Sequence, residues 1–187
     1  TGLTSVTIPD SVNNIGLYVF LNCHKLTSIS VDKNNLVYDS RNNCNAIIET
    51  ATNTLIVGCK NTIIPNGVTS IGDYAFAHCN DLTSIEIPDS VIDIGDYAFT
   101  TCSELTNITI PNSVTNIGTE AFSRCHRLIS VTIPDSIISI GDSAFSWCKS
   151  LTNITIPDSV TDIGKSAFSD CAKLANVNVS NKNTVYD

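Results

Sequence analysis

Charged residues are scarce in this chain, and those of positive sign are the scarcer kind. Charged residues make up 15% of 187, and ten Lys and Arg stand against eighteen Asp and Glu, for a formal net charge of −8. No basic cluster occurs along the sequence, so nucleic acid is not expected as a partner, because an acidic chain repels its phosphates. No apolar run approaches the roughly 18 residues of a membrane span, so membrane insertion by this segment is not expected. Hydrophobic residues still reach 42%, which excludes a disordered chain.

Motifs of catalysis and metal binding are also missing. There is no Gly-rich phosphate loop, nucleophile elbow or HExxH motif. The eight cysteines include no C-x₂-C pair of the kind that binds zinc. Each of the three histidines adjoins a cysteine, but no third residue recurs that could orient a Cys–His dyad. We therefore expect a protein that is not an enzyme, with no catalytic, metal or cofactor site.

What the sequence does contain is a repeat. Proline and phenylalanine each occur six times, and from the second copy onward both series advance by 23 residues, after a first step of 56. One glycine and one cysteine per copy keep the same steps. A fixed period of this length predicts a solenoid. The repeated prolines of the six copies are Pro9, Pro65, Pro88, Pro111, Pro134 and Pro157, and the repeated phenylalanines are Phe20, Phe76, Phe99, Phe122, Phe145 and Phe168.

Residues 82–104 form one clean copy of the repeat. Polar and apolar residues alternate over residues 84–87, which predicts a half-buried strand that Pro88 ends. Gly95 is expected to permit a backbone turn that a Cβ would hinder. The apolar spacing over residues 96–102 predicts a short helix with Asp96 as its N-cap.

This repeat, Leu-x-x-Ile-x-Ile-Pro-x-x-Val-x-x-Ile-Gly-x-x-Ala-Phe-x-x-Cys, resembles the BspA-type leucine-rich repeat family over nearly the whole chain. The resemblance implies an α/β repeat solenoid, right-handed and curved, with a parallel β-sheet on the concave face and short helices on the convex side. It also implies a surface-exposed protein of host-associated microbes, often linked to adhesion. It implies no reaction, and it transfers no binding residue to this chain.

One turn of the array is irregular, over residues 32–58. This turn is ten residues longer than the others and lacks their Pro, Gly and Phe. Two apolar runs, residues 46–49 and 54–57, flank a four-residue segment of hairpin-loop length. We expect a β-hairpin in place of the short helix. A structural role is favoured, and a recognition role stays open because insertions in solenoids often decorate a binding surface.

Cysteines and aspartates both recur once per repeat and should form rows in space. The cysteines are expected to be small buried hydrophobes, although a disulfide between Cys44 and Cys59 is conceivable. The cysteines therefore do not indicate whether the protein works in an oxidising or a reducing compartment. Aspartates after the prolines and glycines could hold calcium, but the Gly-dense motif of calcium-binding solenoids is absent. A solvated acidic edge with turn-forming side chains is the favoured interpretation.

The outward face of the predicted strands is the candidate partner-binding surface. Its side chains are short and neutral, with a single charge and no aromatic ring, so it lacks the anchors of a tight interface. Weak multivalent binding and a merely soluble surface are equally compatible with this composition. The candidate residues on the expected concave face are Ser84, Glu86, Asn107, Thr109, Ser130, Thr132, Asn153 and Thr155.

The chain is read as one solenoid, residues 1–187, cut from a longer array. Residues 31–39 match residues 179–187 at an offset of 148, so a second irregular turn is expected to continue past Asp187. No targeting peptide is seen, since residues 1–4 read as folded domain, and repeats or a leader are expected before Thr1. Uncovered apolar ends predict fraying or end-to-end self-association. The end residues expected against water are Leu3, Val6, Ile8, Leu174, Val177 and Val179.

The functional hypothesis is a non-enzymatic interaction module, at the cell surface or secreted, that adheres to a protein or glycan. The alternative is a passive spacer within a larger surface protein, which near-identical repeats would serve. The packing hypothesis is an interior row of stacked phenylalanine rings through Phe99, Phe122 and Phe145.

Overall fold

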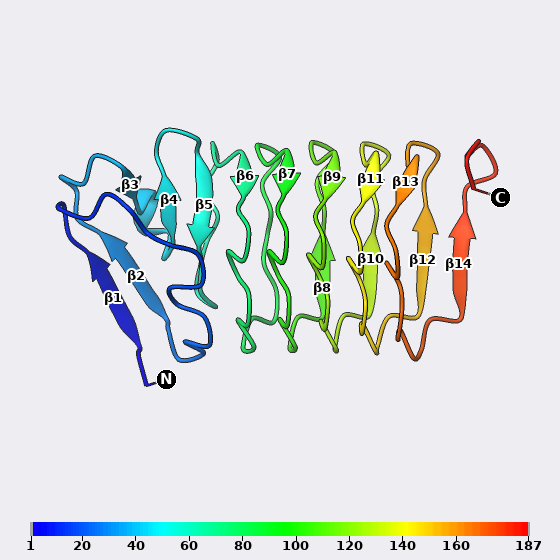
Figure 1. Cartoon of the computed structure of the whole chain (residues 1–187), viewed down its shortest axis with the longest axis horizontal. Coiled ribbons are helices and arrows are strands. Elements are labelled where there is room, and N and C mark those ends of the chain that lie inside the picture. The colour runs from blue at the N-terminus through cyan, green and yellow to red at the C-terminus, as the bar shows by residue number, and fades with distance from the viewer. Residues whose placement is uncertain (1, 187) are drawn as a thin grey trace.

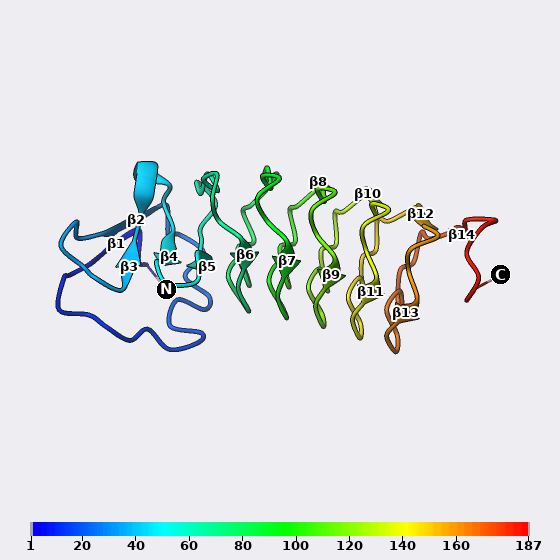
Figure 2. The ribbon, with the colours of Figure 1, turned by 90° about the horizontal axis from the view of Figure 1, so that it is seen from above.

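The computed structural model describes residues 2–186, and its turns stack side by side along one long axis (Figure 1). Figure 2 shows the same order of turns from above. The strands are β1 (Ser5–Ile8), β2 (Ser28–Val31), β3 (Tyr38–Asp39), β4 (Ile47–Glu49), β5 (Thr54–Val57), β6 (Ser70–Ile71), β7 (Asp93–Ile94), β8 (Asn107–Thr109), β9 (Asn116–Ile117), β10 (Ser130–Thr132), β11 (Ser139–Ile140), β12 (Asn153–Ile156), β13 (Asp162–Ile163) and β14 (Asn176–Val179), with one 3₁₀ helix, η1 (Arg41–Asn43).

A regular turn can contribute strands at two places. The predicted strands pair in parallel as β1 with β2, β8 with β10 and β12 with β14. The strand predicted over residues 84–87 is not formed, because this segment pairs with no neighbouring strand. A second sheet, which the sequence did not predict, has eight strands in the order β13-β11-β9-β7-β6-β5-β4-β3. In the regular turns its strands are the two residues before each glycine, too few to show an alternating pattern. The protein is therefore a β-solenoid.

The predicted short helices are wrong. The segment from each repeat's glycine to its cysteine, here called the arm, is a series of tight turns, and η1 is the single helix in the part of the chain described. Tyr97 and Thr101 have φ angles of 58° and 60°, which no right-handed helix accommodates. The N–H of Tyr97 donates to the carbonyl of Thr119 at 2.7 Å, and the N–H of Phe99 donates to that of Ala121 at 2.7 Å. Alternate backbone donors therefore bond to the next arm, while those between them, such as the N–H of Thr100 to the Tyr97 carbonyl at 3.0 Å, close tight turns within the arm.

The repeated glycine serves close stacking between turns. The N–H of Gly118 donates to the carbonyl of Ile94 at 2.9 Å. A Cβ at Gly118 would lie 2.5 Å from the carbonyl carbon of Gly95, a distance that real Cβ atoms do not show. A Cβ would be hindered at Gly95, as expected, since it would lie 2.5 Å from Oδ1 of Asp73. The cause is the close approach of the turns and not conformational freedom, because none of the repeat glycines has a positive φ.

Where an aspartate follows the repeat glycine, it caps the next arm and not a helix of its own. Oδ1 of Asp73 accepts the N–H of Asp96 at 2.8 Å, and Oδ1 of Asp96 accepts that of Thr119 at 2.7 Å. Asp142 binds the N–H of Lys165 in the same way, at 2.6 Å. The predicted N-cap is therefore corrected: the carboxylate satisfies a backbone donor 23 residues ahead.

The predicted phenylalanine row is confirmed. Successive rings from Phe76 to Phe168 are stacked nearly parallel, with centroids 5.0–5.8 Å apart. Phe99, Phe122 and Phe145 are fully buried. Offset-stacked rings at this separation add to the free energy of burial, so the row forms a continuous core along the solenoid.

A cysteine row runs beside the rings. The Sγ of Cys125 donates to the carbonyl of Phe99 at 3.3 Å, and Cys148 bonds to Phe122 at the same distance. Both thiols are fully buried. Burial raises the pKa of Cys125 to about 12, so the thiol stays protonated at neutral pH.

We expect the buried thiols to be protected from alkylation in the folded protein. A pKa of about 12 leaves roughly a thousandth of the thiolate that an ordinary cysteine presents, and burial blocks access as well. Iodoacetamide labelling followed by mass spectrometry should therefore modify Cys125 far more slowly in buffer than in denaturant. Equal rates would contradict the burial.

Because the pKa of Cys125 is raised on folding, the free energy of unfolding should fall as pH rises from about 9 towards 12.

The irregular turn contains the expected hairpin, built into the second sheet. β4 and β5 pair antiparallel, and β5 then pairs in parallel with β6 of the next turn. The guanidinium of Arg41 binds the carboxylate of Asp39 at 2.7 Å and the Asn53 amide oxygen at 2.9 Å. The hairpin thus takes the place of an arm in this turn.

Residues 31–39 and 179–186 fold alike. The side-chain amide of Asn35 donates to the carbonyls of Pro9 and Val12, and its oxygen accepts the N–H of Val37 and of Tyr38. Asn183 makes the four equivalent bonds to the residues that match them in the repeat. The offset match in the sequence is therefore a match in hydrogen bonding.

The end turns are only partly exposed. Leu3 and Val177 are exposed, as expected, while Val6, Leu174 and Val179 are half-buried. The expectation is wrong for Ile8, which is buried in a cluster with Ile29 and Tyr38. The segment after β2 covers it.

Candidate interaction surfaces

The predicted binding residues lie together on one surface, here called the polar strand face. Ser130 pairs with Asn107, and Thr132 pairs with Thr109, so the outward side chains of successive turns stand in two columns, here called the polar columns. Ser84 and Glu86 lie in a segment without strand pairing, held beside β8 by a bond from the Thr106 N–H to the Thr83 carbonyl at 3.2 Å. All eight candidates are exposed: Ser84, Glu86, Asn107, Thr109, Ser130, Thr132, Asn153 and Thr155.

The asparagines of this face are oriented by their threonine neighbours. The side-chain amide of Asn107 donates to Oγ1 of Thr106 at 3.2 Å, and Asn153 donates to Thr152 at 3.3 Å. Each amide oxygen has no protein partner among the described residues, so it is open to accept from a ligand. The face offers rows of short hydroxyl and amide groups without a charge other than Glu86.

An open hollow lies where the polar strand face meets the irregular turn. Asn42, Ile63, Ser84 and Glu86 are among the residues that line it. Ile63 is 75% exposed, an apolar side chain beside polar columns. Nothing in the sequence indicates this hollow. Asn42 joins it through η1, for which the sequence carries no signal.

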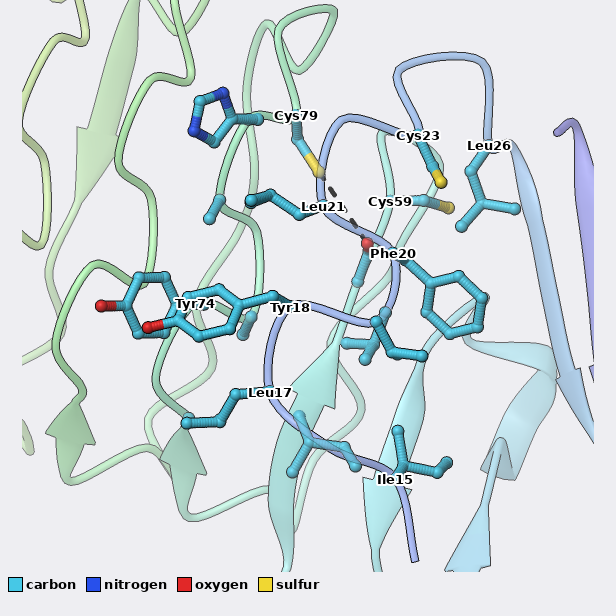
Figure 3. A pocket seen from close by; sticks show the side chains of 18 of the residues that line it. Ile15, Leu17, Tyr18, Phe20, Leu21, Cys23, Leu26, Cys59, Tyr74 and Cys79 are labelled. Atoms are coloured by element: carbon cyan, nitrogen blue, oxygen red, sulfur yellow. Dashed lines mark hydrogen bonds between the residues drawn. The ribbon is translucent and has the colours of Figure 1, made fainter. Parts of the chain in front are cut away.

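A second cavity lies between the first arm (residues 16–23) and the third-turn arm (residues 72–79), and its volume is about 300 Å³ (Figure 3). The irregular turn has no arm, so the first arm reaches across to the third. The rings of Tyr18 and Tyr74 meet edge to face at 4.3 Å, while Phe20 points to the other side of the arm. Sequence spacing missed this cavity because it forms at the 56-residue step.

The wall of this cavity explains why Phe20 does not stack on Phe76. Gly58 packs against the Phe76 ring, where a Cβ would lie 2.1 Å from a ring carbon. The Gly58 N–H donates to the Ala75 carbonyl at 2.8 Å. In the regular turns, the N–H groups of the preceding arm bond to an arm in this way. Phe20 belongs to the separate apolar cluster around the irregular turn.

The cysteine–histidine neighbours form no catalytic arrangement in the described chain. Nδ1 of His24 lies 3.0 Å from the carbonyl oxygen of His78, and Nδ1 of His126 lies 3.0 Å from that of Trp147. Burial, then His24 and Arg124, lower the pKa of His78. The rings are thus held by backbone oxygens. Across residues 2–186, no group of three or more His, Cys, Asp and Glu could hold a metal ion.

The conceivable disulfide between Cys44 and Cys59 is not formed. Cys44 Sγ donates to the carbonyl of Ala46 at 3.8 Å, and Cys59 Sγ donates to that of Asn45 at 3.6 Å. Desolvation by burial raises the pKa of both thiols.

In the stretch the structure describes, no helix has the length and apolar character needed to cross a bilayer.

Comparison with known proteins gives a family match and several similar structures. A family model described as a BspA type leucine rich repeat region matches six copies, in residues 1–55 and 56–175. The chain is similar to a leucine rich cell surface protein of Faecalibacterium prausnitzii, with 36% identity and a TM-score of 0.84 over 96% of this chain and 48% of that one. Among curated proteins, none matches this chain.

Two further bacterial structures share the repeat. The Treponema pallidum (T. pallidum) leucine rich repeat protein is 32% identical, with a TM-score of 0.61 over 70% of this chain and 65% of that one. A leucine-rich repeat protein of Bacteroides ovatus is 36% identical, with a TM-score of 0.60 over 75% and 39%. The chain therefore spans less than two thirds of the length of each of these proteins.

Proposed function

Because the chain belongs to the BspA-type leucine-rich repeat family, we propose that it is a non-enzymatic interaction module of a cell-surface or secreted protein. Its role would be adhesion to a protein or glycan through the polar strand face. One similar structure is described as a cell surface protein, which supports this location.

The observation that carries the proposal is the exposed hollow at Ile63 and Glu86, continuous with the polar columns. An exposed apolar side chain beside oriented amides can anchor a partner that the short polar groups then bind repeatedly. Repetition matters here, because each hydroxyl or amide contributes little alone and a ligand that spans several turns gains from all of them.

We expect the double variant Asn107→Glu/Asn153→Glu to bind its partner at least roughly tenfold more weakly than the parent protein, because it removes amide contacts and places two carboxylates that a bound partner would have to desolvate. The partner would first be identified on arrays of glycans and surface proteins, and affinities then compared by calorimetry. The matched control is Asn13→Glu/Asn112→Glu, which changes the charge equally at exposed positions off this face. Equal weakening by both pairs would contradict the site.

The second candidate function is a passive spacer, favoured by the uniform stacking of the regular turns. Their ring centroids repeat at 5.0–5.3 Å in the first three of the four pairs, as a rigid rod requires. A spacer needs no ligand. The absence of any reproducible partner of micromolar affinity on the arrays would favour it, and one such partner would exclude it.

A further inference from the structure

The charges of this acidic protein are segregated in space. The connections around each cysteine (residues 22–25, 59–60, 78–81, 101–104, 124–127, 147–150 and 170–173) are here called the basic edge. In Figure 1 they lie at the lower edge, where β8, β10, β12 and β14 begin. The basic edge holds six of the ten Lys and Arg but three of the eighteen Asp and Glu, so it carries a formal +3 while the rest of the chain carries −11. The six basic residues are Lys25, Lys60, Arg124, Arg127, Lys149 and Lys173.

Stacking of the arms brings these residues together. The N–H of Arg124 donates to the carbonyl of Ser146, beside Trp147, at 2.8 Å. The N–H of Trp147 donates in turn to the Ser169 carbonyl at 2.8 Å. Residues 23 apart therefore lie on neighbouring rungs, about 4.8 Å apart by the usual strand spacing. No cluster is visible in the sequence because its members are scattered along the chain.

Most of this positive charge is available to a ligand. Arg127 pairs with Glu104 at 2.5 Å, and both side chains remain well exposed to solvent. Arg124, Lys149 and Lys173 are exposed and form no ion pair within residues 2–186. Exposed pairs of this kind are weak and readily exchanged for another anion.

The basic edge also carries the chain's one tryptophan. Trp147 is 41% exposed, and Nζ of Lys149 lies 5.3 Å from its ring centroid. Trp147, Lys149, Phe168, Asp170 and Leu174 are among the residues that line an open hollow at this place. A flat, exposed ring with Lys149 over it and Arg124 on the neighbouring rung suits a sugar ring that carries a negative group on that side.

We propose that the basic edge binds an anionic polysaccharide. A single polysaccharide chain would lie along the edge, its sulfate or carboxylate groups on Arg124, Lys149 and Lys173 and one sugar ring on Trp147. This surface is separate from the polar strand face, and the proposal goes beyond the function assigned to that face.

Two features favour a polysaccharide over single-stranded nucleic acid. Nucleic-acid grooves stack successive bases on several aromatic side chains, and the basic edge has one exposed aromatic ring in the described chain. The −11 on the remaining surface also repels a wide polyanion, whereas a narrow chain can keep to the edge.

The test measures binding to dextran sulfate and to unsulfated dextran of the same length by calorimetry, at roughly 50 and roughly 300 mM salt. We expect the protein to bind dextran sulfate and not unsulfated dextran, with an affinity that falls at the higher salt concentration. Arg124→Glu/Lys149→Glu should weaken it by roughly tenfold or more, and Trp147→Ala should weaken it by a smaller factor. The matched control Lys33→Glu/Lys182→Glu, with the same change of charge at exposed positions outside the basic edge, should bind within about twofold of the parent.

Several results would overturn the proposal. They are no binding to dextran sulfate, equal loss in the edge and control variants, or single-stranded DNA bound as tightly as dextran sulfate. The strand-face variant Asn107→Glu/Asn153→Glu should keep its affinity for dextran sulfate. A failure of the strand-face proposal therefore leaves this one intact, and the reverse holds as well.

Discussion

Phe122→Ala is expected to lower the free energy of unfolding by about 3–5 kcal/mol. The Phe122 ring is fully buried and stacks on Phe99 at 5.2 Å and on Phe145 at 5.3 Å. Its removal leaves a cavity that the rigid neighbouring turns cannot close, and it weakens the interfaces on both sides. A urea melt followed by circular dichroism would measure the change.

Phe168→Ala is the matched control for this prediction. Phe168 is half-buried and stacks on one neighbour, Phe145, at 5.8 Å, so its loss should cost less than half as much. A loss under about 1 kcal/mol at Phe122, or equal losses at the two positions, would show that the ring row does not support the core.

Gly118→Ala is expected to destabilise the protein by at least about 3 kcal/mol. The new Cβ would lie 2.5 Å from the carbonyl carbon and 2.6 Å from the oxygen of Gly95. Both are backbone atoms tied into the ladder, so the two turns must separate and their hydrogen bonds must stretch. A thermal or urea melt measures the loss.

Gly16→Ala tests the same substitution at a repeat glycine against which no neighbouring turn packs. No atom lies within 4 Å of a Cβ at Gly16, so this variant should be neutral or slightly stabilised by the lower entropy of the unfolded chain. A neutral Gly118→Ala would mean that the turns are not stacked as closely as the structure shows.

The repeat sequence predicted the parts of the fold that depend on burial. Phe122 and its equivalents recur at 23 residues, and side chains that repeat at the period of a solenoid stack on themselves. The strand register follows for the same reason, as the pairing of Ser130 with Asn107 confirms. The family match rests on this same pattern.

The arm conformation could not be predicted from the same pattern. Ala98, Phe99 and Cys102 have helical spacing, but the spacing does not show where the backbone donors go. In the folded chain the N–H of Phe99 bonds to the neighbouring arm, and a positive φ at Thr101 ends any helix. The local sequence does not indicate a hydrogen-bond partner 22 residues away. The helical preference of this segment was therefore overridden by the stacking of the turns.

The candidate sites divide in the same way. The polar strand face follows from the alternation of side chains along the strands, so Asn107 and Thr109 share one face as the alternation predicts, and their part in binding stays a prediction. The cavity beside Tyr18 depends on an arm that the irregular turn omits, and the hollow at Ile63 depends on where η1 lies.

The sequence by itself determined the period, the buried rows and the face of the strands, because these depend on side-chain chemistry repeated at one spacing. The tertiary structure alone decided the arms, the close backbone contacts at Gly118 and the gathering of charge at Arg124 and Lys149. Hydrogen bonds, van der Waals contacts and Coulomb interactions depend on the distance between atoms in the folded chain and not on their separation along the sequence. The 23-residue period therefore shows which residues become neighbours, but it does not show which of their atoms touch or hydrogen-bond.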